Sequence, residues 1–159
     1  MKKYIILSTV IVSSVLISTV IINKRKDDVN ICHSEVVWIK DNGTPEGISL
    51  KAKMSILTSN KNQGRINIYG YIKNQELTYR LDRAIYFNHQ PVDKKGNYSI
   101  NFTSLSVTTS DNTPSELFSN FIQLEKDKIN YYVNITKMED NIYILKDEAY
   151  SSFTCHIEQ

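Results

Sequence analysis

The sequence is poor in the residues that build catalytic and metal sites. It has only three histidines and two cysteines among 159 residues, and no CxxC pair. It shows no nucleophile elbow around a serine, no glycine-rich phosphate loop and no pair of catalytic carboxylates. His33 and His156 adjoin the two cysteines, but a metal site usually takes three or four ligands. We therefore expect no enzyme, no cofactor and no metal ion.

The concentrated basic face that nucleic-acid binding requires is also missing. The net charge of +2 arises in residues 1–28, which hold five cations and two anions. The remaining residues hold 14 cations and 15 anions, so they are close to neutral. We therefore expect no nucleic-acid partner.

Long apolar runs are limited to one, residues 4–22, with the sequence YIILSTVIVSSVLISTVII. As an α-helix, this run spans about 28 Å, close to the ~30 Å thickness of the hydrocarbon core. A cleaved signal peptide has a shorter apolar core and a small-x-small site, which Ile21-Ile22-Asn23 does not offer. The run predicts a retained transmembrane anchor in the lipid bilayer. Residues 1–3 are then cytoplasmic, 23–31 a linker and 32–159 an extracytoplasmic domain.

Hydroxyl side chains recur within the predicted anchor. Two pairs lie four residues apart, Thr9 with Ser13 and Ser14 with Ser18. Spacing of this kind lets transmembrane helices approach closely, and it predicts a contact face for a second helix. The alternative is that the hydroxyls bond to the backbone of their own helix.

The two cysteines, Cys32 and Cys155, stand near the two ends of the predicted domain. In an oxidising compartment a pair of cysteines indicates a disulfide, which would join the first strand to the last. The alternative is two unrelated buried thiols.

Apolar residues from Cys32 onward recur with a period of two, which is typical of β-strands. The pattern predicts a mainly β (α+β) fold, with about seven antiparallel strands in a barrel-like meander and one short helix. Gly70 inside a strand indicates a bend or a close backbone approach. The phase of the 97–107 strand changes near Thr103–Ser104, which predicts a β-bulge.

The helix is predicted at Thr113-Pro114-Ser115-Glu116, where Thr113 would be the N-cap and Glu116 would complete a capping box. The apolar residues that follow form one stripe: Leu117, Phe118, Phe121 and Ile122.

Arg83 is the most informative single residue. By the period of two it points with Leu81 and Ile85 toward the core, where a guanidinium needs a charged partner. Asp111 or Glu116 could supply it. The ion pair would either fasten the helix to the sheet or form part of a binding site.

Taken together, these residues resemble the FidL-like membrane proteins of enteric bacteria. The resemblance rests on the cysteine after the anchor, Tyr79-x-x-x-Arg83-x-Ile85-x-Phe87, Asp111-x-x-Pro114 before a short helix, and the cysteine near the end. It implies a single-pass inner-membrane protein with a cytoplasmic N-terminus and a periplasmic domain. It also implies, by analogy with ToxS-type accessory proteins, a ToxR-like membrane-bound regulator as partner.

Two functions are compatible with this sequence. The first is an accessory protein whose sheet edge pairs with a strand of a membrane-bound regulator, with the anchor as a second contact. The alternative is a sensor that holds a small amphipathic ligand in an aromatic-lined cavity, which ten tyrosines favour.

Overall fold

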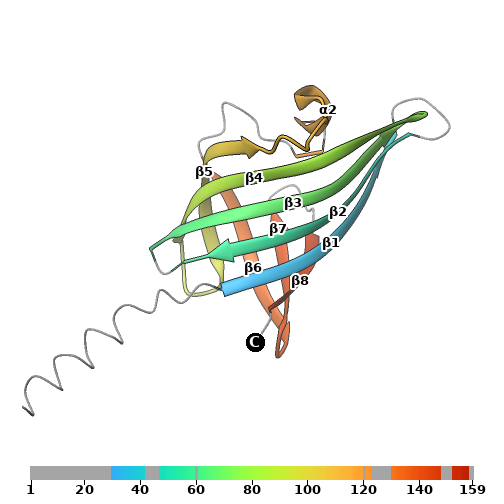
Figure 1. The fold of residues 1–159 in the computed structure, drawn as a ribbon. Helices are drawn as coiled ribbons and strands as arrows, with labels where there is room; N and C mark the ends of the chain where they lie inside the picture. The colour runs from blue at the N-terminus through green and yellow to red at the C-terminus, as the bar shows by residue number, and fades with distance from the viewer. Residues whose placement is uncertain are drawn as a thin grey trace, which may run out of the picture.

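A computed structural model shows an antiparallel barrel of eight strands in sequential order, with one short helix (Figure 1). It describes residues 30–41, 47–59, 61–119, 121–122, 130–147 and 152–157. The elements are β1 (Asn30–Lys40), β2 (Ile48–Thr58), β3 (Gln63–Asn74), β4 (Leu77–Pro91), β5 (Asn97–Val107), α2 (Ser115–Ser119), β6 (Tyr131–Glu139), β7 (Ile142–Asp147) and β8 (Ser152–Ile157).

The predicted antiparallel, barrel-like β fold with one short helix is confirmed, and the meander closes into a barrel. The one difference is the number of strands, which is eight where about seven were expected. β7 and β8 are the shortest strands, with six residues each. β1 begins at Asn30, so it includes the last two residues of the predicted linker.

The predicted anchor and its hydroxyl face lie outside the described residues, and so do Thr9, Ser13, Ser14 and Ser18. Within the part of the chain that the structure describes, no helix has the length and apolar character needed to cross a membrane.

The alternation of β2, β3 and β4 separates an apolar inner face from a polar outer face. Six inner residues are 0–5 % exposed and lie on the same face of the three strands: Leu50, Ala52, Ile68, Ile72, Leu81 and Ile85. Gly70 lies between Ala52 and Leu81, and a Cβ there would collide with the carbonyl of Lys51 and with Ala52. The backbones of β2 and β3 therefore approach closely at Gly70.

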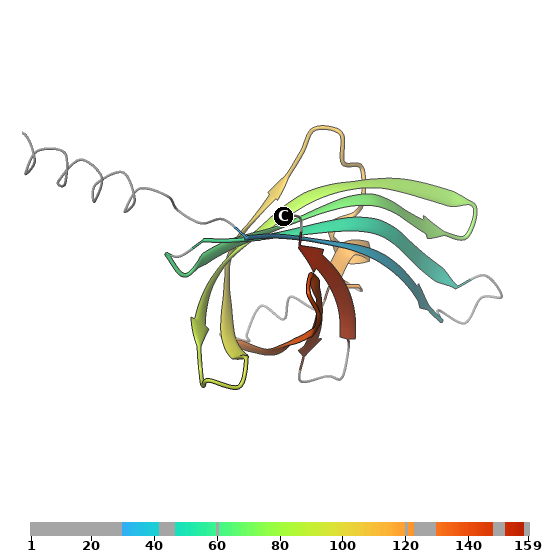
Figure 2. The same ribbon diagram turned by 90° about the horizontal axis from the view of Figure 1, so that it is seen from below.

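The barrel closes through short pairings at one end only. β5 pairs with β6 over four residue pairs, and β1 pairs with β8 over two. By contrast, β1 and β2 pair along eleven residues. In consequence β1–β4 extend as a curved sheet well past the ends of β6–β8 (Figure 2).

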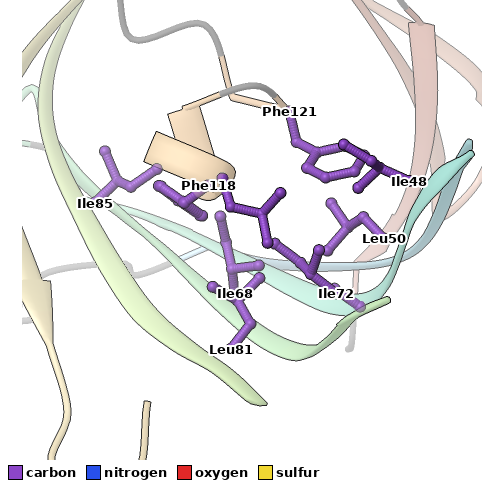
Figure 3. Packing of buried hydrophobic residues seen from close by; sticks show 10 residues of the cluster. Ile48, Leu50, Ile68, Ile72, Leu81, Ile85, Phe118 and Phe121 are labelled. Carbon is purple, nitrogen blue, oxygen red and sulfur yellow. The ribbon is translucent and has the colours of Figure 1, made fainter. Parts of the chain in front are cut away.

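Two apolar clusters fill the concave side. In the extended part, Phe118 and Phe121 of the helical segment pack on Ile68 and Ile72 and on neighbouring residues of β2 and β4 (Figure 3). At the closed end, the second cluster contains Cys32, Ile56, Phe87, Leu145 and Cys155. The helical segment therefore covers the inner face of the extended sheet, and β6–β8 cover the inner face at the closed end. Without them these apolar faces would be exposed to solvent.

β5 has the irregularity that its change of phase predicts. Ser104 pairs with Tyr86 and Phe102 pairs with Phe87, so Thr103 is the extra residue. The bulge places Phe102, Leu105 and Val107 on one face of β5, opposite Phe87, Ile85 and Arg83 of β4. Leu105 is 43 % exposed and Val107 is 50 % exposed, because β6 leaves β5 after Ile100.

Candidate functional site

Arg83 forms a buried ion pair inside the extended part of the sheet. Its Nε and Nη2 donate to the two carboxylate oxygens of Asp111, both at 3.0 Å, and Nη2 also donates to the carbonyl of Thr113. The two charged side chains are 2 % and 1 % exposed. The guanidinium lies over the ring of Phe118, 4.5 Å from its centroid. Of the two candidate partners, the structure selects Asp111, while Glu116 is exposed on α2.

The segment around Asp111 covers the edge of β4 where β5 ends. The backbone N–H of Asp82 donates to Asp111 Oδ2 at 2.9 Å, and that of Arg80 donates to Asn112 Oδ1 at 2.6 Å. The N–H of Asn112 and the hydroxyl of Thr113 both donate to the carbonyl of Arg80. Thr113 does not take the predicted N-cap position, because α2 begins at Ser115 and the first helical hydrogen bond runs from Phe118 to the carbonyl of Pro114. The ion pair fastens the helix entry to the sheet and protects this edge.

Lowering the pH is expected to destabilise the protein through Asp111. Burial raises the pKa of Asp111, but the bond from Arg83, two backbone N–H groups and the charge of Arg83 together hold it below its ordinary value. The folded pKa is thus lower than that of the unfolded chain, about 3.9. The stabilisation is complete above the unfolded value and is lost as the pH falls through the folded pKa.

Urea unfolding between about pH 6 and pH 3 measures this loss. Asp111→Asn should be less stable at pH 6 and should lose stability less steeply with acid, because Asn cannot titrate. Glu116→Gln is the matched control and should keep the steep wild-type dependence. An Asp111→Asn protein with an unchanged acid slope would contradict the assignment.

The opposite edge of the sheet lies on β1. β8 pairs only with Cys32 and His33, so within the described residues no strand pairs with this side of Ser34–Lys40. We call this segment the β1 edge. Val37 and Ile39 are each 69 % exposed, and Trp38 is 42 % exposed with its ring 6.1 Å from that of Phe121. Among the residues that the structure describes, the β1 edge thus combines a row of backbone groups that no strand pairs with and several exposed apolar side chains.

Natural proteins usually protect such edges with charges, prolines or bulges. Here Glu35 and Lys40 stand near the two ends, and Glu35 lies 3.5 Å from Lys53 of β2. Between them, Val36–Ile39 are four consecutive apolar residues without a bulge in their pairing with β2. An edge of this composition is a template for a further strand.

The sequence contains one feature that indicates the β1 edge, although the predictions from period-two alternation did not use it. In Val36–Ile39 apolar residues occupy both faces of the strand, which a half-buried strand does not require. The cover of the β4 edge carried no such signal, because it depends on Asp111 and Asn112 lying about 30 residues from their partners.

Cys32 and Cys155 lie at disulfide distance, with their Cα atoms 5.5 Å apart. Both are buried, and they join β1 to β8 where those strands pair. On the other face of the same junction, His33 is opposite His156, and His33 Nδ1 lies 2.9 Å from the Ser55 hydroxyl. In the described ranges, no group of three potential ligands is placed to hold a metal ion.

Two surface hollows flank the closed end. The first lies at the β6–β7 turn and is lined by Glu139–Ile142 and His156. The second lies beside the β2–β3 turn, where Tyr86 is the one aromatic residue in its lining. Neither is the aromatic-lined internal cavity that the ligand-sensor hypothesis expects.

The fold defines a small antiparallel β-barrel domain that is closed at one end, and within the described residues one edge of its extended sheet, on β1, is left unpaired. The family of FidL-like putative membrane proteins matches residues 70–155, which is more than half of the chain, and the protein belongs to this family. The resemblance drawn from the sequence is confirmed over this range, which includes Arg83, Asp111 and α2 but not Cys32 or the predicted anchor. No curated protein matches the chain.

Proposed function

We propose that this protein is anchored in the bacterial inner membrane by residues 4–22 and places its barrel in the periplasm. There it acts as an accessory protein that binds the extracytoplasmic part of a ToxR-like membrane-bound transcriptional regulator. The observation that carries the proposal is the β1 edge, with its exposed Val37 and Ile39. Membership of a family of putative membrane proteins and a cysteine pair at disulfide distance support the location.

The mode of binding is strand addition. An extended segment of the partner would continue the sheet beyond β1, and main-chain hydrogen bonds would supply the affinity. Side chains would supply the specificity, because Val37 and Ile39 face one side of the sheet and Trp38 the other. The β1 edge offers seven residues, about 23 Å of strand, which suits a short extended peptide.

Photo-crosslinking in cells tests this proposal. A photoreactive amino acid at Val37 should crosslink to a protein that has one membrane span and a DNA-binding domain. The same group at Tyr132, which is 44 % exposed on β6, should give no such product. Products with other classes of protein, or equal labelling from both positions, would contradict the regulator as the partner.

Val37→Lys provides the corresponding loss of function. A charge on an edge strand opposes strand addition, so the amount of regulator that co-purifies should fall at least tenfold. The free energy of unfolding should change by less than about 0.5 kcal/mol, because the side chain is largely exposed. Tyr132→Lys should leave co-purification unchanged. Normal recovery of the regulator with Val37→Lys would exclude the β1 edge as its binding site.

A further inference from the structure

The outer face of the extended sheet is rich in cations and tyrosines. In one row across the strands Tyr71 lies between Lys51 and Arg80, and in the next row Lys53 lies beside Tyr69. Lys73 continues the pattern on β3. We call these six residues the β2–β4 outer face; their side chains point away from the apolar cluster under α2, because the intervening residues are buried.

The charge of this side of the barrel differs from that of the rest of the molecule. The outward positions of β1–β4 carry five cations, the four of the β2–β4 outer face and Arg65, against two anions, Glu35 and Asp82. The other described residues carry seven cations and eight anions. The positive charge of a nearly neutral domain is therefore gathered on one convex surface.

The tyrosines make this surface amphipathic rather than merely charged. Tyr69 is 45 % exposed and Tyr71 is 50 % exposed, and the guanidinium of Arg80 lies 5.5 Å from the ring centroid of Tyr69. Tyrosine has an apolar ring and a polar tip, which favours the boundary between lipid and water. Cations beside such rings attract anionic headgroups, and each adds to the attraction.

We propose that the β2–β4 outer face binds the surface of a bilayer that contains anionic lipids. The cations of this face complement the negative charge of anionic lipids. The short segment between the predicted anchor and β1 keeps the face within reach of the bilayer. Only seven residues, 23–29, separate the predicted anchor from Asn30, the first residue of β1, so the domain lies within about 25 Å of the bilayer. β1 borders the β2–β4 outer face, and residues 23–29 include Lys24, Arg25 and Lys26.

This inference rests on the anchor of the proposed function but not on the regulator. The β1 edge offers hydrogen bonds in the plane of the sheet, whereas the β2–β4 outer face presents side chains perpendicular to it. A partner strand and a lipid surface can therefore be bound together. Val37→Lys separates them, because it should abolish strand addition while adding a cation beside Lys51.

Lysine footprinting of the full chain in lipid nanodiscs tests the proposal. Discs of phosphatidylcholine are compared with discs that also contain phosphatidylglycerol, and an amine-reactive reagent labels accessible lysines. The reactivity of Lys51, Lys53 and Lys73 should fall several-fold in the anionic discs and recover at high salt. Lys94 and Lys95 in the exposed β4–β5 turn are internal controls and should react equally in both discs.

Charge reversal provides a second readout. In a Lys51→Glu/Lys73→Glu variant the protection of Lys53 should be lost, whereas a Lys94→Glu/Lys95→Glu variant should keep it. Equal reactivity of Lys53 in the two lipids would overturn lipid binding and leave the regulator hypothesis intact. Protection of these lysines in neutral discs as well would indicate contact between copies of the chain. Protection that is seen in cells but not in discs would indicate an acidic protein as the ligand. Either result would overturn the proposal. A chain that does not enter the discs would overturn both the anchor and this inference.

Discussion

Replacing Cys32 and Cys155 with alanine is expected to lower the free energy of unfolding by about 5 kcal/mol. The two residues are 123 positions apart, so a bond between them closes almost the whole described chain into one loop and restricts the unfolded state. The junction that it holds is weak by itself, since β1 and β8 share only two residue pairs.

Urea denaturation of the oxidised wild type, the reduced wild type and the double-alanine variant measures this effect. The reduced wild type and the variant should have similarly lowered midpoints, and a reductant should not affect the variant further. Hydrogen exchange should show the largest loss of protection in β8 and the start of β1, with β2 and β3 affected less. Coincident midpoints for oxidised and reduced protein would show that the pair contributes no stability.

Arg83→Met is expected to lower the free energy of unfolding by about 3–5 kcal/mol. The methionine fills part of the space, but Asp111 is left buried without its cation. The helix entry also loses a hydrogen bond, because Arg83 donates to the carbonyl of Thr113. The loss should appear in urea denaturation and as a looser helix entry, visible as faster exchange of the Asp82 N–H that donates to Asp111.

A double-mutant cycle isolates the ion pair from these other effects. The Arg83→Met/Asp111→Asn variant lacks both charges. Its loss of unfolding free energy should be smaller than the sum of the two single losses, by about 1 kcal/mol or more. Glu116→Ala should be nearly neutral, because that side chain is exposed. Strict additivity would mean that the two residues act separately. A stable Arg83→Met protein that no longer binds its partner would assign Arg83 to a binding site.

Much of the local structure could be read from the sequence because it depends on neighbouring residues. The period of two identified the strands, the change of phase in the 97–107 segment located the bulge, and the apolar stripe after Pro114 identified the helix. Burial of Arg83 followed from its place between Leu81 and Ile85. For the candidate site, the sequence predicted binding at a sheet edge but did not indicate which strand forms that edge.

The tertiary structure decided what depends on contacts between distant parts of the chain. Period-two alternation specifies which face of a strand is buried, but both hydrogen-bonding edges of a strand look alike in sequence. The sequence therefore could not show that β8 leaves β1 after His33 or that Asp111, not Glu116, meets Arg83. The barrel closes at one end because β8 pairs with β1 only at Cys32 and His33. Beyond His33, no described strand pairs with the β1 edge.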